Sequence, residues 1–413
     1  VLVANGEIYN DLIIRKQIKK YNYKTKSDSE SILAVYKEFG LEGFKKLRGM
    51  FSFAIYDQKK KITILGRDLF GIKPLYFSVI DEGIVFSSEI LAIKKVNLQK
   101  LNISEDKLLE FFQIQYCSGK KTIFKEIQRV RPGEVIVLKD GKINESIIAK
   151  LPSQKKQKKV LDDNFIFKNL KECVETHLRS DVPYCLFYSG GIDSTLIMYF
   201  MHILNLNKKI CAYSVNFENN DKTAYELTKN LKNQFNIELN QIKFTEEDFW
   251  NILPFAAKKI DEPIADYAIL PTFKMASEAS KNFKVALSGE GGDELFAGYG
   301  RYKSLRSPYK GAFRKLSFLS QKNWDFNLKL SIDGKSEFSQ LQTFQYFDYV
   351  NWLPNNLLVK LDRCLMTFGM EGRTPLIDKE LYSKFFYIDD KFKQKKGYGK
   401  YLIRKFLNNK IKN

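Results

Sequence analysis

The alternation of expected helices and strands in the second half of the chain is the feature that most constrains its fold. In order, the pattern indicates a helix from Asn164 to about Ser180, strand Tyr184–Tyr188, helix Thr195–Leu204, strand Ile210–Phe217, a helix reaching Phe235, a strand to Phe244 and strand Lys284–Ser288. Because parallel strands need crossover helices, this alternation predicts an α/β domain with a doubly wound, mostly parallel sheet. The residues beyond Gly300 are expected to form a helical tail.

The first half of the chain predicts a β-rich α+β module instead. Its expected elements are helix Ser29–Phe39 and strands Phe51–Tyr56, Lys61–Gly66, Leu75–Val79 and Val135–Lys139, separated by turns rich in Gly, Asp and Lys. Apolar periodicity lapses over residues 151–162 (LPSQKKQKKVLD), as in a domain linker. We therefore expect one domain over residues 1–150, the linker 151–162, and a second domain over residues 163–413.

Composition excludes several other classes of protein. No run of about 18 uncharged apolar residues occurs, and the N-terminus lacks a secretory pattern, so we expect a cytoplasmic protein. The five cysteines are scattered and only two histidines accompany them, which argues against a disulfide framework or a structural zinc site. The net charge of +20 is spread along the whole chain, so nucleic-acid binding is not expected. Residue 1 is Val1 within a strand-like run (VLVA), and we expect the sequence to be a fragment or a truncated reading frame.

The sharpest motif is Ser189-Gly190-Gly191-Ile192-Asp193-Ser194, between an apolar strand and a helix. A glycine turn at a helix N-terminus presents backbone N–H groups to an anion, and its glycines allow a phosphate to approach closely. Ser189 and Ser194 can donate to phosphate oxygens, while Asp193 can hold a magnesium ion. The alternative is a tight turn whose Ser and Asp only cap the helix.

A second glycine-rich loop, Ser288-Gly289-Glu290-Gly291-Gly292-Asp293-Glu294, follows another apolar strand. Loops at the carboxyl ends of parallel strands can face one crevice, so Asp193 and Asp293 could share the same magnesium ion. Without such a role the three acidic side chains would repel one another. A solvated acidic turn is the structural alternative.

These motifs carry a family resemblance. SGGIDS resembles the pyrophosphate loop of the N-type ATP pyrophosphatases and differs from a P-loop, which implies cleavage between the α and β phosphates of ATP. LSGEGGDELFAGY (287–299) resembles the matching segment of asparagine synthetases. The match extends to DEP at 261–263, LPT at 270–272, Leu353-Pro354, Lys360-Leu361-Asp362-Arg363, Glu371 to Asp378, and Lys400. One departure is Ile377, where the family usually has Phe, and the chain stops sooner after Lys400 than family members do.

The N-terminal half resembles the glutaminase domain of the same family, an Ntn-hydrolase type. Its signatures are NGEIYN (5–10), SDSE (27–30), GMFSFA (49–54), Arg67-Asp68 and GIKPLY (71–76). The resemblance implies that Asn5, Gly6 and Glu7 contact glutamine and its oxyanion, and that Asp28 binds the amino group of glutamine. An Asn side chain and a glycine N–H are suitable oxyanion donors. Taken alone, Asn5-Gly6 also favours a hairpin turn.

The family's glutaminase attacks with a cysteine at the mature N-terminus, whose α-amino group is the base. Residue 1 here is Val1 and the first cysteine is Cys117, so residues 1–413 are not expected to hydrolyse glutamine. The upstream stretch bearing the arginine that binds the glutamine carboxylate is also absent.

The resemblance implies ATP-dependent amidation of aspartate to asparagine through β-aspartyl-AMP, with nitrogen from glutamine in the complete enzyme and from ammonia in this fragment. Glu290 and Lys400 are the catalytic candidates; Glu290 would position or deprotonate ammonia, and Lys400 would lie near the ATP phosphates. Asp193 and Asp293 would bind Mg²⁺. A homodimer is compatible with the resemblance. The expected ATP and pyrophosphate contacts are Tyr188, Ser189, Gly190, Gly191, Asp193, Ser194, Val215, Ser288 and Gly289.

Three alternatives stay open at this point. A relative could amidate another carboxylate such as a sugar acid, since Tyr184–Tyr188 gives the strand before the first loop bulky side chains. Closure of a β-lactam ring is disfavoured, because β-lactam synthetases typically carry tyrosine where Glu290 stands. A non-catalytic basic scaffold or RNA-binding protein predicts lesions in the phosphate loop, which is intact.

Overall fold

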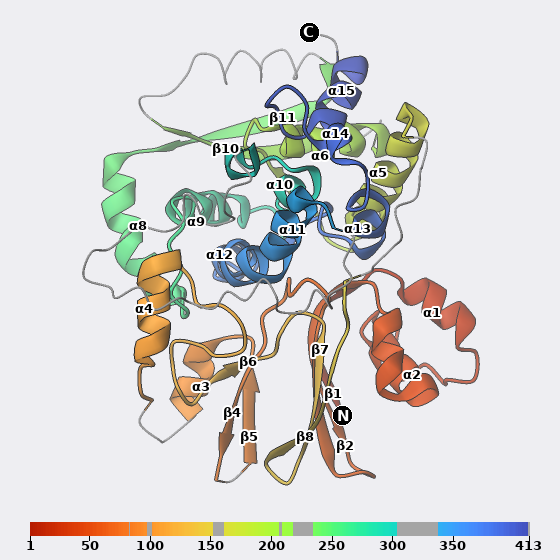
Figure 1. The fold of residues 1–413 in the computed structure, drawn as a ribbon, viewed down its shortest axis with the longest axis vertical. Helices are drawn as coiled ribbons and strands as arrows, with labels where there is room; N and C mark the ends of the chain where they lie inside the picture. Colours follow the sequence, from red (N-terminus) through yellow and green to blue (C-terminus); the bar gives the residue numbers. More distant parts are fainter. Residues whose placement is uncertain are drawn as a thin grey trace.

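The computed structural model describes residues 1–81, 83–96, 101–151, 161–205, 209–217, 234–303 and 338–411. Two domains, an α+β N-terminal domain and an α/β C-terminal domain, are stacked along the long axis of the molecule (Figure 1). Most of the expected linker (152–160) and the expected helix before Phe235 (218–233) lie outside the described residues.

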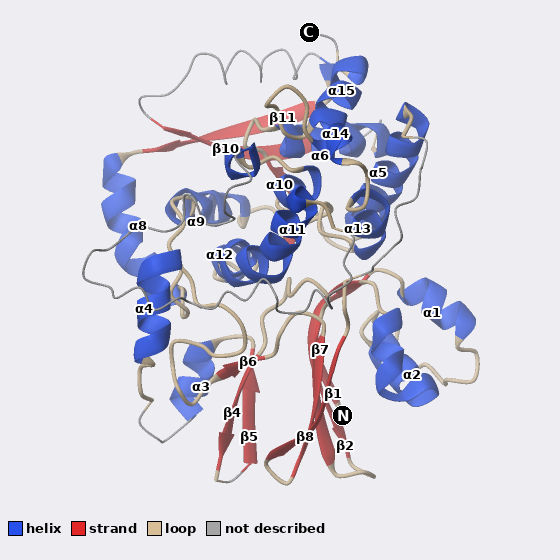
Figure 2. Cartoon of the chain, viewed as in Figure 1, coloured by secondary structure: helices blue, strands red, loops and turns tan. Residues whose placement is uncertain are grey.

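Two antiparallel sheets form the centre of the N-terminal domain (Figure 2). The first has the order β1-β2-β3-β7-β8, and the second has the order β5-β4-β6. Their bounds are β1 Leu2–Ile8, β2 Gly49–Asp57, β3 Ile62–Arg67, β4 Tyr76–Ile80, β5 Gly83–Ser87, β6 Gln128–Arg129, β7 Glu134–Lys139 and β8 Lys142–Ile148. Leu65, Phe77 and Ile136 belong to one buried apolar cluster, which ties the two sheets together.

Helices flank both sheets of this domain. The bounds are α1 Asp11–Gln17, α2 Glu30–Phe39, the 3₁₀ helix η1 Gly40–Lys46, α3 Ile90–Val96 and α4 Glu105–Ile114. Ile32 and Val35 of α2 pack with Phe53 of β2, as the helical spacing in the sequence predicts. The four expected strands and helix α2 are present within one or two residues of their expected ends.

Asn5 and Gly6 do not form a hairpin turn. Both lie inside strand β1, where Asn5 pairs with Ser52 and Gly6 pairs with Phe51 of β2. The Asn-Gly signal is local, and pairing with a long central strand overrides it.

The C-terminal domain contains a five-stranded parallel sheet with the order β11-β10-β9-β12-β13. The bounds are β9 Tyr184–Phe187, β10 Ile210–Phe217, β11 Ile237–Phe244, β12 Val285–Leu287 and β13 Glu371–Arg373. The order runs outward in one direction from β9 to β11 and in the other direction from β12 to β13. The topological switch point therefore lies between β9 and β12, the two strands that precede the glycine-rich loops.

Helices cover both faces of this sheet. Leu186 packs in one apolar cluster with α5, α6, α13 and α15, whereas its neighbours Cys185 and Phe187 pack in another with α8, α9 and α12. The bounds are α5 Asp163–Leu178, α6 Ile192–Leu204, α8 Glu246–Lys259, α9 Ile269–Ala279, α10 Gly292–Phe296, η2 Gly300–Lys303, α11 Gln340–Phe347, a π-helix (η3) Asp348–Leu357, α12 Leu358–Met366, α13 Lys379–Phe385, α14 Asp390–Lys393 and α15 Tyr401–Lys410. Among the helices described, none is long and apolar enough to cross a membrane.

The prediction that the residues beyond Gly300 are helical is wrong at one place. Residues Glu371–Arg373 form strand β13, which pairs with Val285–Leu287 of β12. The segment is only three residues long, and it becomes a strand because β12 offers it an open edge, which periodicity cannot reveal.

Candidate functional site

The first glycine-rich loop folds around its own serines at the switch point. Ser189 Oγ lies 3.2 Å from Ser194 Oγ, and Ser194 Oγ donates to the carbonyl of Gly191 at 3.0 Å. Gly190 has φ +75°, a conformation that favours glycine, and no atom lies within 4 Å of the position its Cβ would take. The loop therefore leaves its outer side open above the start of α6.

Asp193 and Asp293 meet at a single lysine. The ammonium group of Lys400, the residue before α15, is hydrogen-bonded to Asp193 Oδ2 and lies 2.8 Å from Asp293 Oδ1. The two aspartates follow different strands, and the adjacent positions of β9 and β12 bring them together. The site that the sequence predicts from two distant loops is thus one cluster.

Two glycines permit this close approach. A Cβ on Gly292 would lie 2.3 Å from Cγ of Asp193. A Cβ on Gly298 would lie 1.9 Å from Oδ1 of Asp293 and 2.1 Å from Cε of Lys400. Neither contact is sterically allowed, so the glycines of the second motif provide space for the charged groups.

The electrostatics of the cluster suit a cation. Burial raises the pKa of Asp193 to about 6; Lys400 lowers it, and the neighbouring charges of Asp293 and Glu290 raise it. Burial by itself would lower the pKa of Lys400, but the two aspartates raise it above its ordinary value. Oδ1 of Asp193 is buried and has no hydrogen-bond partner. A buried carboxylate oxygen without a partner, beside a second carboxylate, fits the oxygen ligands that Mg²⁺ prefers.

Glu290 is held by a residue to which the sequence assigned no role. Its carboxylate lies 3.1 Å from Nζ of Lys360 in α12, and Lys360 lies 3.1 Å from Asp266. Although burial alone would lower the pKa of Lys360, Glu290 and Asp266 raise it, so this ammonium group stays charged. Lys360 belongs to the KLDR motif, but only the fold shows that it fixes the orientation of Glu290.

The other expected ATP contacts surround the cluster less directly. Ser288 donates its backbone N–H to the backbone carbonyl of Arg373 at 2.9 Å, and a Cβ on Gly289 would lie 3.0 Å from Cβ of Asp193. The hydroxyl of Tyr188 lies 3.4 Å from that of Thr195. Val215 is partly buried against an apolar cluster of the sheet.

The expected glutamine contacts divide into two pairs. Glu7 and Asp28 line a cavity of about 590 Å³, together with Arg179 and Arg373 of the other domain. Burial raises the pKa of Glu7 to about 7, and Glu7 lies 3.3 Å from Arg373.

Asn5 and Gly6 are not among the residues that line this cavity. The side chain of Asn5 donates to Ser88 at 3.3 Å, and Gly6 packs on the carbonyl of Met50.

Cys173, His177 and Asp378 form a buried group whose ligand atoms lie within 4.8 Å of one another. Asp378 already accepts hydrogen bonds from Arg48 and from the backbone N–H groups of Glu380 and Leu381. Burial raises the pKa of Cys173, which disfavours the thiolate that a metal needs. The group is therefore explained by packing and helix capping.

Comparison with known proteins agrees with this geometry. Residues 1–148 match the glutamine amidotransferase domain family, and residues 166–412 match the asparagine synthase family. The fold and the two matches define a glutamine-dependent carbon–nitrogen ligase with an amidotransferase domain and a synthase domain. Within that class, the chain belongs to the asparagine synthase family.

Several curated relatives are similar over most of the chain. Asparagine synthetase (glutamine-hydrolyzing) 1 of Bacillus subtilis is 30% identical over 98% of this chain and 72% of the relative. Putative asparagine synthetase (glutamine-hydrolyzing) 2 of Methanocaldococcus jannaschii is 33% identical over 72% of this chain and 59% of the relative. A putative asparagine synthetase (glutamine-hydrolyzing) of Mycobacterium tuberculosis is 28% identical over 93% of this chain and 68% of the relative.

Proposed function

We propose that this chain amidates aspartate to asparagine with ATP, through a β-aspartyl-AMP intermediate. The observation that carries the proposal is the meeting of Asp193, Asp293 and Lys400 at the switch point of a parallel sheet. Ligands of doubly wound sheets bind at that position, and the charges of these residues suit ATP phosphates with a magnesium ion. The names of the relatives support asparagine as the product.

Each group of the cluster has a role in this proposal. The β-carboxylate of aspartate attacks the α-phosphorus of ATP and pyrophosphate leaves, bound by Lys400 and by the loop Ser189–Ser194. Ammonia then attacks the acyl carbon and AMP leaves, while Glu290, held by Lys360, accepts a proton. Asp193 and Asp293 would hold a magnesium ion, which neutralises phosphate charge when it is bound.

We also propose a division of labour between the two halves. Residues 1–150 would be part of an Ntn-hydrolase-type glutaminase, residues 151–162 a linker and residues 163–413 the synthetase domain. Glutamine would supply ammonia in the complete enzyme, with Glu7 and Asp28 in the interdomain cavity as the best-placed contacts. A polypeptide of residues 1–413 by itself is proposed to take free ammonia.

The test is product analysis with the purified chain. ATP, Mg²⁺, aspartate and ammonium should together give AMP, pyrophosphate and asparagine in equal amounts, and Asp193→Asn should lower the formation of all three to a small fraction of wild type. Formation of ADP instead of AMP would refute the pyrophosphatase chemistry.

Another carboxylate substrate, such as a sugar acid, is the alternative that the same experiment addresses. The bulky side chains of Tyr184–Tyr188 favour this alternative in the sequence. In the structure, however, Leu186, Phe187 and Tyr188 are buried in the core clusters on the two faces of the sheet. This burial argues against these side chains as the walls of an acceptor site. A panel of carboxylates in place of aspartate should release pyrophosphate most rapidly with aspartate.

A further inference from the structure

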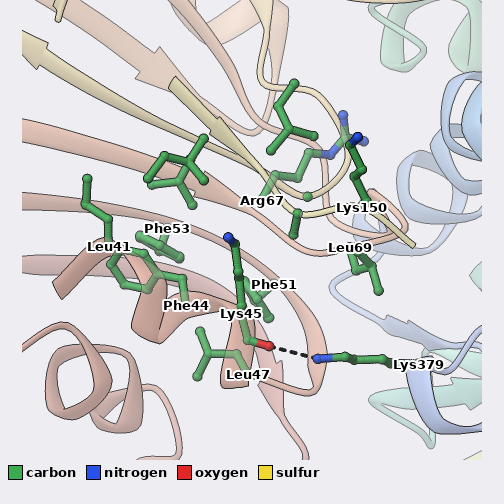
Figure 3. Close-up of a pocket in the computed structure, with 15 residues that line it drawn as sticks. Leu41, Phe44, Lys45, Leu47, Phe51, Phe53, Arg67, Leu69, Lys150 and Lys379 are labelled. Carbon is green, nitrogen blue, oxygen red and sulfur yellow. Dashed lines mark hydrogen bonds between the residues drawn. The ribbon is translucent and has the colours of Figure 1, made fainter. Parts of the chain in front are cut away.

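A cavity of about 390 Å³ lies in the N-terminal domain, away from the phosphate cluster (Figure 3). It opens between the helix-covered face of the first sheet and η1. Most of its wall is apolar and includes three phenylalanines: Phe44 from η1, and Phe51 and Phe53 from β2. A cavity of this size and lining is typical of sites for small organic ligands.

The ionisable side chains that line the cavity are all basic: Lys45, Arg67, Lys150 and Lys379. The figure shows Arg67, Lys150 and Lys379 on the side of the cavity that faces the C-terminal domain, opposite Leu41 and Phe44. No Asp or Glu is among the described lining residues. Acids do lie close to some of these cations: Glu42 pairs with Lys45 at 2.6 Å, Asp68 lies next to Arg67, and Asp378 and Glu380 flank Lys379.

Two of these cations, Arg67 and Lys379, donate hydrogen bonds to neutral backbone carbonyls. The guanidinium of Arg67 donates to the carbonyls of Lys73, Val130 and Gly71 at 2.7 to 2.9 Å. Nζ of Lys379 donates to the carbonyl of Lys45 at 2.8 Å and keeps two further N–H groups. Burial lowers the pKa of Lys379 more than the flanking Glu380 and Asp378 raise it, so a further anion beside it would stabilise its charged form.

From this arrangement we infer that the cavity is a binding site for a small carboxylate with an apolar body, such as a medium-chain carboxylic acid. The phenylalanines would bury the apolar chain, and Lys379 would bind the carboxylate in the field of Arg67. Apolar burial gives the affinity, and the one-signed charge of the wall selects the head group.

Lys379 belongs to the C-terminal domain, so the proposed site includes residues of both domains. Lys379 follows Asp378, which caps α13 and pairs with Arg48 of the N-terminal domain at 2.8 Å. A carboxylate held by Lys379 would therefore add a contact across the same junction. Bound ligand should raise the temperature at which the chain unfolds.

The experiment compares octanoate, octylamine and 1-octanol as probes, using calorimetry and thermal unfolding of the full chain. Octanoate should bind one per chain and raise the unfolding temperature. Octanol should bind at least about tenfold more weakly, because it lacks the charge-assisted hydrogen bond. Octylamine should not bind.

Two variants locate the site. Lys379→Met should lower octanoate affinity about tenfold and leave octanol binding unchanged. Lys281→Met removes an exposed lysine of the other domain that pairs with Glu278, and should change neither. Absence of saturable octanoate binding would overturn the inference, as would equal affinity for octanol, or equal losses in the two lysine variants.

Discussion

At the scale of single residues, the site depends on space as much as on charge. Asp193, Asp293 and Lys400 can meet only because Gly292 and Gly298 lack side chains. The sequence predicts the shared role of the two aspartates, because loops after adjacent parallel strands converge. It does not predict that Lys360 holds Glu290, because α12 reaches the loop only through the packing of the tail.

Gly298→Ala tests the requirement for space. A Cβ at 1.9 Å from the Asp293 carboxylate must displace Asp293 or Lys400, and a shift of about 1 Å in a catalytic group costs roughly a hundredfold in rate. Gly300→Ala is the matched control, since nothing lies within 4 Å of its Cβ position. We expect AMP formation to fall about a hundredfold in the first variant and to stay near wild type in the second. Equal activity of the two variants would contradict this account.

Asp193→Asn and Asp293→Asn test whether the two carboxylates act as one unit. Both contact Lys400, so each single variant should lose most of the activity, and the double variant should lose little more. The rate of pyrophosphate release with ammonium as nitrogen donor provides the measurement. Losses that add fully in the double variant would show that the aspartates have separate roles.

At the scale of elements, the sequence pattern predicts the helices and strands whose formation depends mainly on residues close together in the chain. The apolar runs predict strands β9, β10, β11 and β12, and the 3.6-residue spacing predicts helix α2. The predicted ends agree with the observed ends within one or two residues. Strand β1 contains Asn-Gly, and β13 is three residues long; each is a strand because of its partner. Such pairings join residues far apart in sequence, so a single sequence does not reveal them.

Helix α5 carries a histidine that should make stability depend on pH. His177 is buried against Tyr9, with ring centroids 4.2 Å apart, and burial lowers its pKa to about 4. In the unfolded chain the histidine has its ordinary pKa near 6.5. Between about pH 4 and about pH 6.5 the unfolded chain therefore binds a proton at this histidine, whereas the folded chain does not. Stability is therefore lost as pH falls from about 6.5 to about 4, by roughly 3 kcal/mol from this group.

His177→Phe keeps the ring contact with Tyr9 and removes the titration. Its loss of stability between pH 7 and pH 4 should be smaller than that of wild type by roughly 3 kcal/mol, as measured by urea unfolding. At pH 7 the variant should be about 1 kcal/mol less stable, because the hydrogen bond from Nδ1 to the Cys173 carbonyl is lost. His202→Phe, at a partly exposed position, is the control. The same pH response in wild type and His177→Phe would exclude this histidine as the cause.

At the scale of the whole molecule, buried charges join the two domains. Lys73 lies 3.2 Å from Asp362, Arg363 donates to the carbonyl of Ser88 at 2.7 Å, and Arg129 is paired with Glu262. Several of these residues belong to the DEP and KLDR segments, which the sequence associates with the synthetase domain. The structure places those segments at the domain junction, so their charged side chains connect the two halves.

Arg129→Met should weaken that junction. Arg129 and Glu262 are 0% and 1% exposed, so the variant leaves a buried carboxylate that, within the described residues, keeps a hydrogen bond from the Tyr76 hydroxyl at 2.8 Å. Breaking one side of a buried pair costs about 3 to 5 kcal/mol, and adding Glu262→Gln should recover part of that loss. Arg131→Met is the control, because Arg131 pairs with Glu134 inside the N-terminal domain and its side chain is 41% exposed.

Calorimetry of these variants would show whether the domains unfold together. Shared buried ion pairs make the folded state of each domain depend on the other, so wild type and Arg131→Met should each give one transition. Arg129→Met should instead unfold in two transitions, the first of them below the wild-type temperature. The reason is that the variant lacks a buried contact that holds the two domains together. If Arg129→Met also unfolds in one transition at the wild-type temperature, the pair does not couple the domains.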